Sequence, residues 1–434
     1  MASSRKSQSK LKSQKRIAVA LSGGLDSVVL LDTVCKTQTS DKNTPTEIWA
    51  FHIHHGLQKP ADDWLIFCEK LAKKYKIGFD FRLLHLAQDV EQGNIEARAR
   101  AGRYEALAEL CVEYGIEDLL LAHHQNDQAE TVLLQLLRGA GVAGLSGMPN
   151  RRELTYDQNC ITLWRPLLNQ SRAELEIYAK AHKLQWIEDP SNQSIQFRRN
   201  AIRKQIIPRL EKIQPAAVAN LARSANLLSE AQTLLDRLAK EDGKSILLKD
   251  SVSIKPLLTL AQSDLAAANN VLRYWLKAHQ MAMPSQERLQ AWWTDLQSAR
   301  LDAQIEWLHD GVKLRVWRGQ LQATTKISGQ WIYQVIPSKS QRLGLAAAWV
   351  KTAQDNGQVE FRMRSGSEKI QIKPNSPRKT LKNLFQEGDI PPWQREAPLL
   401  YIEGELIAVA GIGPSYPHLV NSGARVWPEW QEGT

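Results

Sequence analysis

The sequence predicts an α/β protein: a parallel sheet with helices on both faces, then a mostly helical middle domain and a small α+β domain at the C-terminal end. Three observations lead to this prediction. Strand-like and helical apolar patterns alternate up to about residue 125, as in repeated βα units. Helical periodicity dominates after Pro190, and short strand patterns dominate from about residue 340. The 434 residues are enough for about three domains of about 150 residues each.

The first part should contain four strands, each followed by a helix. The strand patterns cover 16–21, 48–54, 79–84 and 118–122. The first helical pattern ends near Cys35, and the others cover 61–75, 94–114 and 128–137. In sheets of this kind, ligands bind beyond the carboxyl ends of the strands. Three segments that follow strand ends are therefore expected to meet at one edge of the sheet: 22–27, 52–56 and 123–127.

Two more domains are expected further along the chain. Long helical patterns cover 206–240 and 286–299, and strands at 305–309 and 312–317 flank Asp310-Gly311, a pair that suits a tight primed turn. Strand patterns follow at 359–364, 369–372 and 399–410, interrupted by a short basic helix at 379–385. The expected division is a basic disordered tail at 1–15, a first domain at 16–209, a mostly helical middle domain with a β-hairpin at 210–335 and an α+β domain at 340–434.

The chain is basic, with a net charge of +10 from 56 basic and 46 acidic residues. This excess favours a polyanionic partner, with nucleic acid ahead of a membrane surface. No apolar run approaches the roughly 18 residues of a membrane-spanning helix, and the basic start of the chain lacks the apolar core of a signal peptide. The four cysteines have no C-x-x-C spacing, which fits a reducing compartment and no cysteine zinc site. We therefore expect a cytoplasmic protein that does not associate with membranes.

The segment Ser22-Gly23-Gly24-Leu25-Asp26-Ser27 lies between an apolar strand and an apolar helix. Backbone N–H groups at a helix N-terminus hold phosphate, and glycine lets the backbone approach it closely. Asp26 adds a carboxylate, which is a hard oxygen ligand for Mg²⁺. The segment therefore predicts a nucleotide-phosphate site rather than an ordinary strand-to-helix turn. It is not a Walker A loop, because no Gly-Lys-Ser/Thr follows.

A second polar segment, residues 123–131, lies where the fourth strand ends and a helix begins. Asp127 and Glu130 are three residues apart, so they should share one helix face. Two carboxylates that face a cavity can hold an ammonium group or a metal ion. The alternative is that they only stabilise the N-terminus of the helix.

Two segments rich in arginine fit contacts with phosphate or RNA. Residues 94–104 place several arginines on a helix, where they either clamp phosphates or form a solvated basic face. Residues 197–203 combine Phe197 with three arginines and Asn200, which suits contact with an RNA backbone and base stacking. The alternative for the second segment is a basic hinge between domains.

The glycine-rich segment resembles the PP-loop of the N-type ATP pyrophosphatases, which have the adenine nucleotide alpha hydrolase-like fold and cleave ATP to AMP and pyrophosphate. The order of motifs along the chain is similar to that of the bacterial tRNA(Ile)-lysidine synthetase family within this superfamily. These motifs cover 16–209 densely and are S-G-G-L-D-S, H-H-G-L, N-I-E-A-R-A-R, A-H-H, D-Q-A-E-T, W-R-P-L-L, D-P-S-N and R-N-x-I-R. Residues 381–387 and 390–393 are similar to the last domain of the family.

The resemblance implies an ATP-dependent ligase that modifies tRNA. In that family, ATP adenylates the C2 oxygen of the wobble cytidine of a tRNA(Ile) with a CAU anticodon, and pyrophosphate leaves. The ε-amine of free lysine then attacks C2 and AMP leaves, which yields lysidine and converts the tRNA from Met to Ile decoding and charging. ATP and Mg²⁺ are the implied cofactors, and tRNA(Ile) and free L-lysine are the implied partners. A homodimer is compatible with this interpretation.

The motifs lead to a set of expected site residues. The expected catalytic residues are Asp26, Asp127, Glu130, Arg103 and His123, with Asp26 as the metal ligand. The expected ATP-binding residues are Ser22, Gly23, Gly24, Leu25, Asp26, Ser27, His52 and Ile53. The expected tRNA-binding residues are Arg198, Arg199, Asn200, Arg203, Lys373, Arg378, Lys379 and Lys382. The family often has aspartate at the position of Asn126, so only the two carboxylates after it are carried over.

Another PP-loop enzyme is the main alternative, such as a tRNA thiolase or a GMP or NAD synthetase. Thiolases of this group usually use paired catalytic cysteines, and amidotransferase types need an ammonia-producing glutamine domain. The sequence indicates neither feature. An RNA-binding protein with a relic ATP site is the non-enzymatic alternative, and the intact Asp26, Asp127 and Glu130 argue against it.

Overall fold

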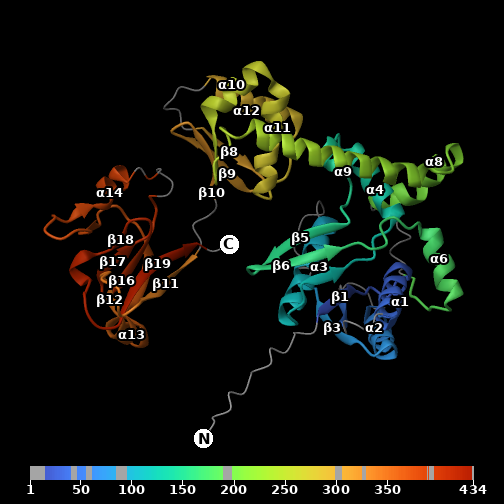
Figure 1. The fold of residues 1–434 in the computed structure, drawn as a ribbon, viewed down its shortest axis with the longest axis horizontal. Helices are drawn as coiled ribbons and strands as arrows, with labels where there is room; N and C mark the ends of the chain where they lie inside the picture. The colour runs from blue at the N-terminus through green and yellow to red at the C-terminus, as the bar shows by residue number, and fades with distance from the viewer. Residues whose placement is uncertain are drawn as a thin grey trace, which may run out of the picture. The chain divides into compact units, whose positions relative to one another are not determined.

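A computed structural model of the protein describes residues 15–40, 46–54, 61–84, 95–188, 198–298, 305–324, 329–388, 390 and 395–432. The chain divides into two compact units, Met1–Arg237 and Leu238–Thr434 (Figure 1). The expected basic tail before Lys15 and the expected site segment at 55–56 lie outside the described residues. No helix in the described ranges is long and apolar enough to cross a membrane.

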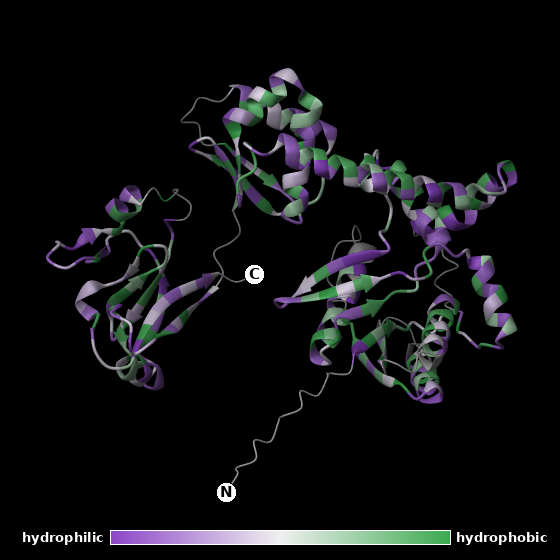
Figure 2. Cartoon of the chain, viewed as in Figure 1, coloured by the Kyte–Doolittle hydropathy of each residue, from purple (hydrophilic) through white to green (hydrophobic). Residues whose placement is uncertain are grey.

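The first unit is built on a six-stranded sheet with the order β3-β2-β1-β4-β6-β5. Its strands are β1 (Arg16–Ala20), β2 (Glu47–His54), β3 (Gly78–Leu83), β4 (Asp118–Leu120), β5 (Arg151–Tyr156) and β6 (Asn159–Trp164). Five strands run parallel, and β5 pairs antiparallel with β6 at the edge. The four expected strands and the parallel sheet are thus confirmed. The β5–β6 hairpin was not expected, and Figure 2 shows why, because β5 is mostly hydrophilic.

Helices cover both faces of this sheet. The helices up to residue 242 are α1 (Leu25–Ser40), α2 (Ala61–Tyr75), α3 (Ile95–Glu113), α4 (Gln125–Leu136), α5 (Val142–Leu145), α6 (Arg172–Ala181), α7 (Arg198–Ala201), a π-helix (Ile202–Ile206), α8 (Ile207–Ile213) and α9 (Ala217–Asp242). Successive residues of β1 point to opposite faces. Val19 packs in a core with residues of α1, α2 and α6, and Ala18 packs in a second core with residues of α3. Each face of the sheet therefore has its own apolar core.

The long helix expected at 206–240 is wrong in one respect, because the structure breaks it. Helix α8 ends at Ile213 and α9 begins at Ala217. Pro215 lies in the gap, and its ring nitrogen has no N–H to continue the helical hydrogen bonds. The start of the pattern also differs, since Ile202–Ile206 forms a turn of π-helix.

The second unit begins with helices packed on a small sheet. The elements are β7 (Ser251–Ser253), α10 (Ile254–Ser263), α11 (Leu265–Ala278), α12 (Gln286–Ser298), β8 (Glu306–His309), β9 (Val312–Trp317) and β10 (Gln320–Thr324). Four tryptophans, Trp275, Trp292, Trp293 and Trp307, lie in its core. The expected hairpin is confirmed as β8–β9, with φ values of +51° at Asp310 and +77° at Gly311, as a primed turn requires.

The rest of the second unit consists of small antiparallel sheets with two short helices. The elements are β11 (Gly329–Ile336), β12 (Leu345–Ala346), α13 (Ala347–Asp355), β13 (Val359–Met363), β14 (Lys369–Ile370), β15 (Lys379–Thr380), α14 (Leu381–Glu387), β16 (Pro398–Ile402), β17 (Glu405–Val409), β18 (Gly413–Pro414), a 3-10 helix (Tyr416–His418) and β19 (Arg425–Glu432). The single strand expected at 399–410 is wrong. It is the hairpin β16–β17, because Glu403 and Gly404 have φ values of +50° and +80° and form a tight turn.

Candidate active site

The loop after β1 has the geometry of an anion cradle. Helix α1 begins at Leu25, and its first internal hydrogen bond runs from Val28 N–H to the Gly24 carbonyl at 3.1 Å. The N–H groups of the residues between them have no acceptor within the helix and are available to an anion. Gly23 has a φ of +84°, and a Cβ there would lie 3.2 Å from both Cys68 Sγ and Ile187 Cδ1. Only glycine fits this position without displacing its neighbours.

Hydrogen bonds hold the cradle in shape. Ser27 Oγ donates to the Gly24 carbonyl at 2.9 Å and lies 3.1 Å from Ser22 Oγ. His52 Nδ1 lies 2.9 Å from the Leu21 carbonyl, which can only accept, so this nitrogen carries the proton. Burial lowers the pKa of His52, so the ring is held neutral. The side chains of His52 and Ile53 are both buried, and His52 therefore supports the residue before the loop.

Asp26 and Asp127 both lie near the same nitrogen of one buried histidine. His124 Nε2 lies 3.5 Å from Asp26 Oδ2 and 3.5 Å from Asp127 Oδ2, and the imidazole is 1% exposed. Burial opposes a charge on His124, but the two carboxylates outweigh it and raise the pKa of the ring. Asp26 Oδ1 is buried and accepts no hydrogen bond within the described part of the chain. The structure therefore joins the loop after β1 to the N-terminus of α4 at one edge of the sheet.

Asp127 and Glu130 are paired with two arginines that come from about seventy residues further along the chain. Arg199 Nε lies 2.7 Å from Glu130 Oε2, and Arg203 Nε lies 2.5 Å from Glu130 Oε1. Both Nη2 atoms lie 3.2 Å from Asp127 Oδ1. The side chain of Glu130 is fully buried. Burial alone would raise the pKa of Asp127. The charges of His124 and Arg199 outweigh burial, so the pKa lies below its ordinary value and the carboxyl stays ionised. Two residues expected to bind tRNA thus form ion pairs with two residues expected to be catalytic.

Asp127 also stabilises the start of α4. Its Oδ2 accepts the backbone N–H of His124 at 3.1 Å. The helix-capping alternative is therefore correct for Asp127, and it holds together with the ion pairs. Asn126 Oδ1 accepts the backbone N–H of Arg172 at 3.0 Å, which satisfies the first N–H of α6. Arg172 Nη1 in turn lies 3.7 Å from Asp26 Oδ2.

His123 is half-buried and the side chain of Arg103 is exposed, and positive charges lie near both. Burial, together with the charges of Arg165, Arg199 and Arg100, lowers the pKa of His123 to about 3, against a smaller opposing effect of Asp127. Partial desolvation and the charges of Arg100 and Arg199 also lower the pKa of Arg103. His123 is therefore a neutral imidazole at physiological pH.

Sequence reasoning missed Arg165 and Arg172. Arg165 follows the end of β6, is 4% exposed and donates Nη1–H to the Pro149 carbonyl at 2.7 Å. Because the β5–β6 hairpin was not predicted from the sequence, neither arginine could be placed at the carboxyl edge of the sheet. The available signal was the W-R-P-L-L motif, whose arginine directly follows a strand.

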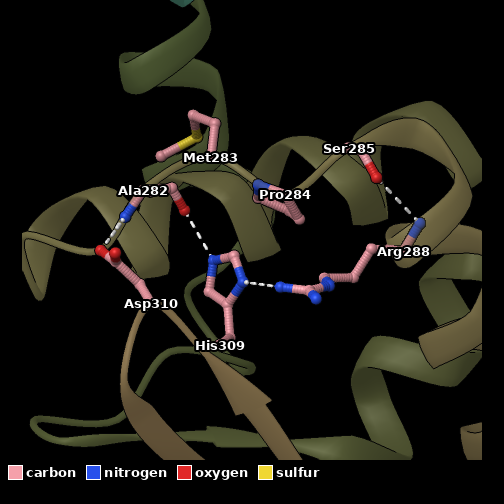
Figure 3. Close-up of a pocket in the computed structure, with 7 residues that line it drawn as sticks. All are labelled: Ala282, Met283, Pro284, Ser285, Arg288, His309 and Asp310. Atoms are coloured by element: carbon pink, nitrogen blue, oxygen red, sulfur yellow. Dashed lines mark hydrogen bonds between the residues drawn. The ribbon is translucent and has the colours of Figure 1, made fainter. Parts of the chain in front are cut away.

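The remaining expected tRNA-binding residues lie elsewhere. Arg198 is exposed on α7, next to Asn200. Lys373, Arg378 and Lys382 are exposed in the second unit, and Lys379 Nζ is bound by both Glu387 oxygens at 2.8 Å. The second unit also has a hollow of about 430 Å³ (Figure 3), lined by Ala282, Met283, Pro284, Ser285, Arg288, His309 and Asp310. Its polar groups bind one another: His309 Nε2–H donates to the Ala282 carbonyl at 2.7 Å, and His309 Nδ1 accepts from Arg288 at 3.2 Å.

Three family models match the chain. A PP-loop domain model matches residues 2–210, a TilS substrate binding domain model matches 256–322, and a TilS substrate C-terminal domain model matches 359–430. Among solved structures, the U34-tRNA thiolase NcsA from Methanococcus maripaludis is 19% identical with a TM-score of 0.42, over 50% of this chain and 74% of that chain. This distant likeness does not favour the thiolase alternative.

Curated relatives match nearly the whole chain. The tRNA(Ile)-lysidine synthase of Ralstonia nicotianae is 38% identical over 92% of this chain and 89% of the relative. That of Nitrosomonas europaea is 37% identical over 92% of this chain and 88% of the relative. The described fold and the order of motifs agree with this similarity. The chain therefore belongs to the tRNA(Ile)-lysidine synthase family.

Proposed function

We propose that this protein joins the ε-amine of free lysine to C2 of the wobble cytidine of a CAU-anticodon tRNA(Ile), with ATP as the activating substrate. The observation that carries the proposal is the arrangement around His124, which lies 3.5 Å from both Asp26 and Asp127. One carboxylate belongs to the phosphate cradle and the other to a buried acidic pair. An adenylating site and an amine site are thus adjacent, as two successive steps on one cytosine require.

The first step is adenylation of the cytosine C2 oxygen. That oxygen is a poor leaving group until it carries AMP, and the step releases pyrophosphate. The N–H groups of Leu25, Asp26 and Ser27 bind the phosphates and stabilise the charge that develops on the leaving pyrophosphate. The buried Asp26 Oδ1, which has no hydrogen-bond partner among the described residues, fits a role as Mg²⁺ ligand. When bound, Mg²⁺ would supply further charge stabilisation at the phosphates.

The second step is attack by lysine, whose ε-ammonium has an ordinary pKa of about 10.4 and must lose a proton first. Asp127 and Glu130 bind the ammonium group, since they are two carboxylates on one helix face. His123 contributes no positive charge to this site, because its pKa lies near 3. It can therefore accept a hydrogen bond from the amine or from the adenylated base without repelling lysine. Arg103, on α3, is assigned to the α-phosphate.

The tRNA is bound by residues spread along the chain. We assign 16–209 as the PP-loop catalytic domain, 210–335 as the middle domain and 340–434 as a tRNA-binding domain. Arg198 and Asn200 contact the anticodon arm. A C-terminal basic cluster, defined as Lys373, Arg378, Lys379 and Lys382, contacts a second part of the tRNA, and three of its four side chains are exposed.

The test is incorporation of labelled lysine into a tRNA(Ile) transcript with a CAU anticodon, with and without ATP. We expect ATP-dependent label at the wobble position. Label that does not require ATP, or no label at all, would contradict the proposal.

A substitution at Asp127 tests in the same assay whether this residue binds the lysine amine. Asp127→Asn keeps the size of the side chain and an oxygen for the His124 N–H, but it loses the charge. We expect lysine incorporation to fall by at least about a hundredfold, while tRNA affinity changes by less than about threefold. If tRNA affinity falls as much as incorporation, Asp127 does not serve the amine.

A further inference from the structure

The carboxylates that the proposed function assigns to lysine are already occupied. Arg199 and Arg203 make six hydrogen bonds to Asp127 and Glu130, five to carboxylate oxygens and one to the Asp127 carbonyl. Both oxygens of Glu130 are engaged. A lysine ammonium cannot take its place in this arrangement until a guanidinium moves away.

Moving an arginine away is unfavourable unless the carboxylate gains another cation and the guanidinium gains another anion. Glu130 is fully buried, and a buried carboxylate that loses its partner is strongly destabilising. An incoming ammonium compensates for that loss, because one cation replaces another. The displaced guanidinium also needs an anion, and phosphate is the anion that its planar donor fork binds best.

The two arginines are placed for such an exchange. Their side chains are 18% and 31% exposed, so they reach solvent from one side and the buried carboxylates from the other. Arg203 lies in the π-helix Ile202–Ile206, a type of turn that is often found at functional sites. Arg198 is exposed on the adjoining α7, so the same segment already presents a free cation to a polyanion.

We propose that Arg199 and Arg203 couple tRNA binding to lysine binding by exchanging partners. In the free enzyme they pair with Asp127 and Glu130 and close the lysine site. When tRNA binds, backbone phosphates of its anticodon arm take the two guanidinium groups, and the lysine ammonium takes the carboxylates. This inference rests on the proposed function. It explains how the same arginines serve both as partners of the catalytic carboxylates and as tRNA contacts.

The test measures lysine affinity in the absence of ATP, so that no chemistry occurs. Labelled L-lysine is equilibrated by dialysis against the full-length protein, alone and with a saturating CAU-anticodon tRNA(Ile) transcript. We expect tRNA to tighten lysine binding about tenfold or more, and lysine to tighten tRNA binding by the same factor, because coupling is reciprocal. Equal lysine affinity with and without tRNA would overturn the proposal.

Three variants locate the coupling. Arg203→Gln frees one oxygen of Glu130, so lysine should bind more tightly to the free enzyme. The ratio of the lysine affinity with tRNA to the lysine affinity without tRNA should therefore fall toward one. If this variant is poorly folded, Arg203→Lys keeps the charge but loses the fork, and it should reduce the ratio in the same direction. Arg198→Gln is the matched control, because it removes the same charge from an exposed neighbour that makes no ion pair within the described residues. It should weaken tRNA binding and leave the ratio at saturating tRNA unchanged.

The labelling assay separates the two proposals. If the wild-type protein incorporates lysine but shows no coupling, the exchange is wrong and the proposed function stands. If an unchanged ratio is found in both Arg203 variants, the coupling runs through other residues and the exchange is again wrong. If no lysine is incorporated, the proposed function itself fails.

Discussion

The candidate active site of the first unit and the C-terminal basic cluster of the second unit use charge in opposite ways. In the candidate active site, Glu130 is fully buried, His124 is 1% exposed, and Asp127 and Glu130 each have arginine partners. In the C-terminal basic cluster, three of the four cations are exposed, and only Lys379 has an ion pair there among the described residues. Buried charges depend strongly on one another, whereas exposed charges act independently and are screened by salt. Substitutions in the two regions should therefore differ in both size and additivity.

The largest loss of activity is expected from a substitution at Asp26, which tests most directly whether the buried charges of the first unit depend on one another. Asp26→Asn keeps the shape of the side chain and removes the charge beside the phosphate cradle. ATP–pyrophosphate exchange, measured with tRNA present, should fall by at least about a hundredfold. The matched control is Arg172→Gln, which alters the 3.7 Å partner of the same carboxylate and has a side chain that is 42% exposed.

We expect the Arg172 variant to retain exchange within about fivefold, because a long, partly exposed ion pair contributes little. Exchange that survives in Asp26→Asn would refute the assigned role of this carboxylate. Equal losses in the two variants would mean that the network around Asp26, rather than its position at the phosphates, is what matters.

The C-terminal basic cluster should show smaller and additive effects. Lys373→Gln, Arg378→Gln and Lys382→Gln should each weaken tRNA binding a few-fold and each reduce the slope of log affinity against log salt by about 1. Lys379→Gln is the internal control, since Glu387 already neutralises Lys379 at 2.8 Å. A salt slope that is unchanged in the triple variant would remove this cluster from the tRNA interface.

Most of the fold could be predicted because its signals are local. Apolar runs and glycine turns gave the strands β1 to β4, and the Asp310-Gly311 pair placed the β8–β9 hairpin correctly. Pro215 and Gly404 were equally local signals for a helix break and a turn, but they lay inside longer apolar patterns that concealed them. Strand β5 carries Arg151, Arg152 and Glu153 in an exposed edge, so it has no apolar pattern to recognise.

The candidate site was predictable as a set of residues but not as a set of pairs. Strand ends and motif order indicated that Asp26, His123 and Asp127 lie near one another. The pairing of Arg199 and Arg203 with Asp127 and Glu130 joins positions 69 to 76 residues apart, and nothing in the local spacing of either segment indicates it. Sequence chemistry alone assigned these arginines to RNA, because it could not show that buried carboxylates lie within reach.

The last prediction concerns stability rather than activity and comes from His123, a half-buried group that carries no charge. Its pKa is about 3 in the folded protein, compared with an ordinary value of about 6.5 in the unfolded chain. Between these values the unfolded chain binds a proton that the folded protein does not, so the free energy of unfolding rises with pH. The contribution of His123 is complete above pH 6.5 and is lost as the pH falls toward 3. From pH 7 to pH 5 the loss is about 2 kcal/mol at most.

His123→Gln removes this titration while keeping a polar side chain. The unfolding temperature of the variant, measured by calorimetry on the full chain, should therefore fall less between pH 7 and pH 5 than that of the wild type. Asp127 does not obscure the comparison, because its pKa is lowered and its own loss of stability begins in more acidic solution. Equal acid sensitivity in both proteins would mean that the imidazole is solvated and can be charged. The active site would then tolerate an unpaired cation, as the exposed C-terminal basic cluster does, and the contrast between the two regions would be weaker than the buried geometry indicates.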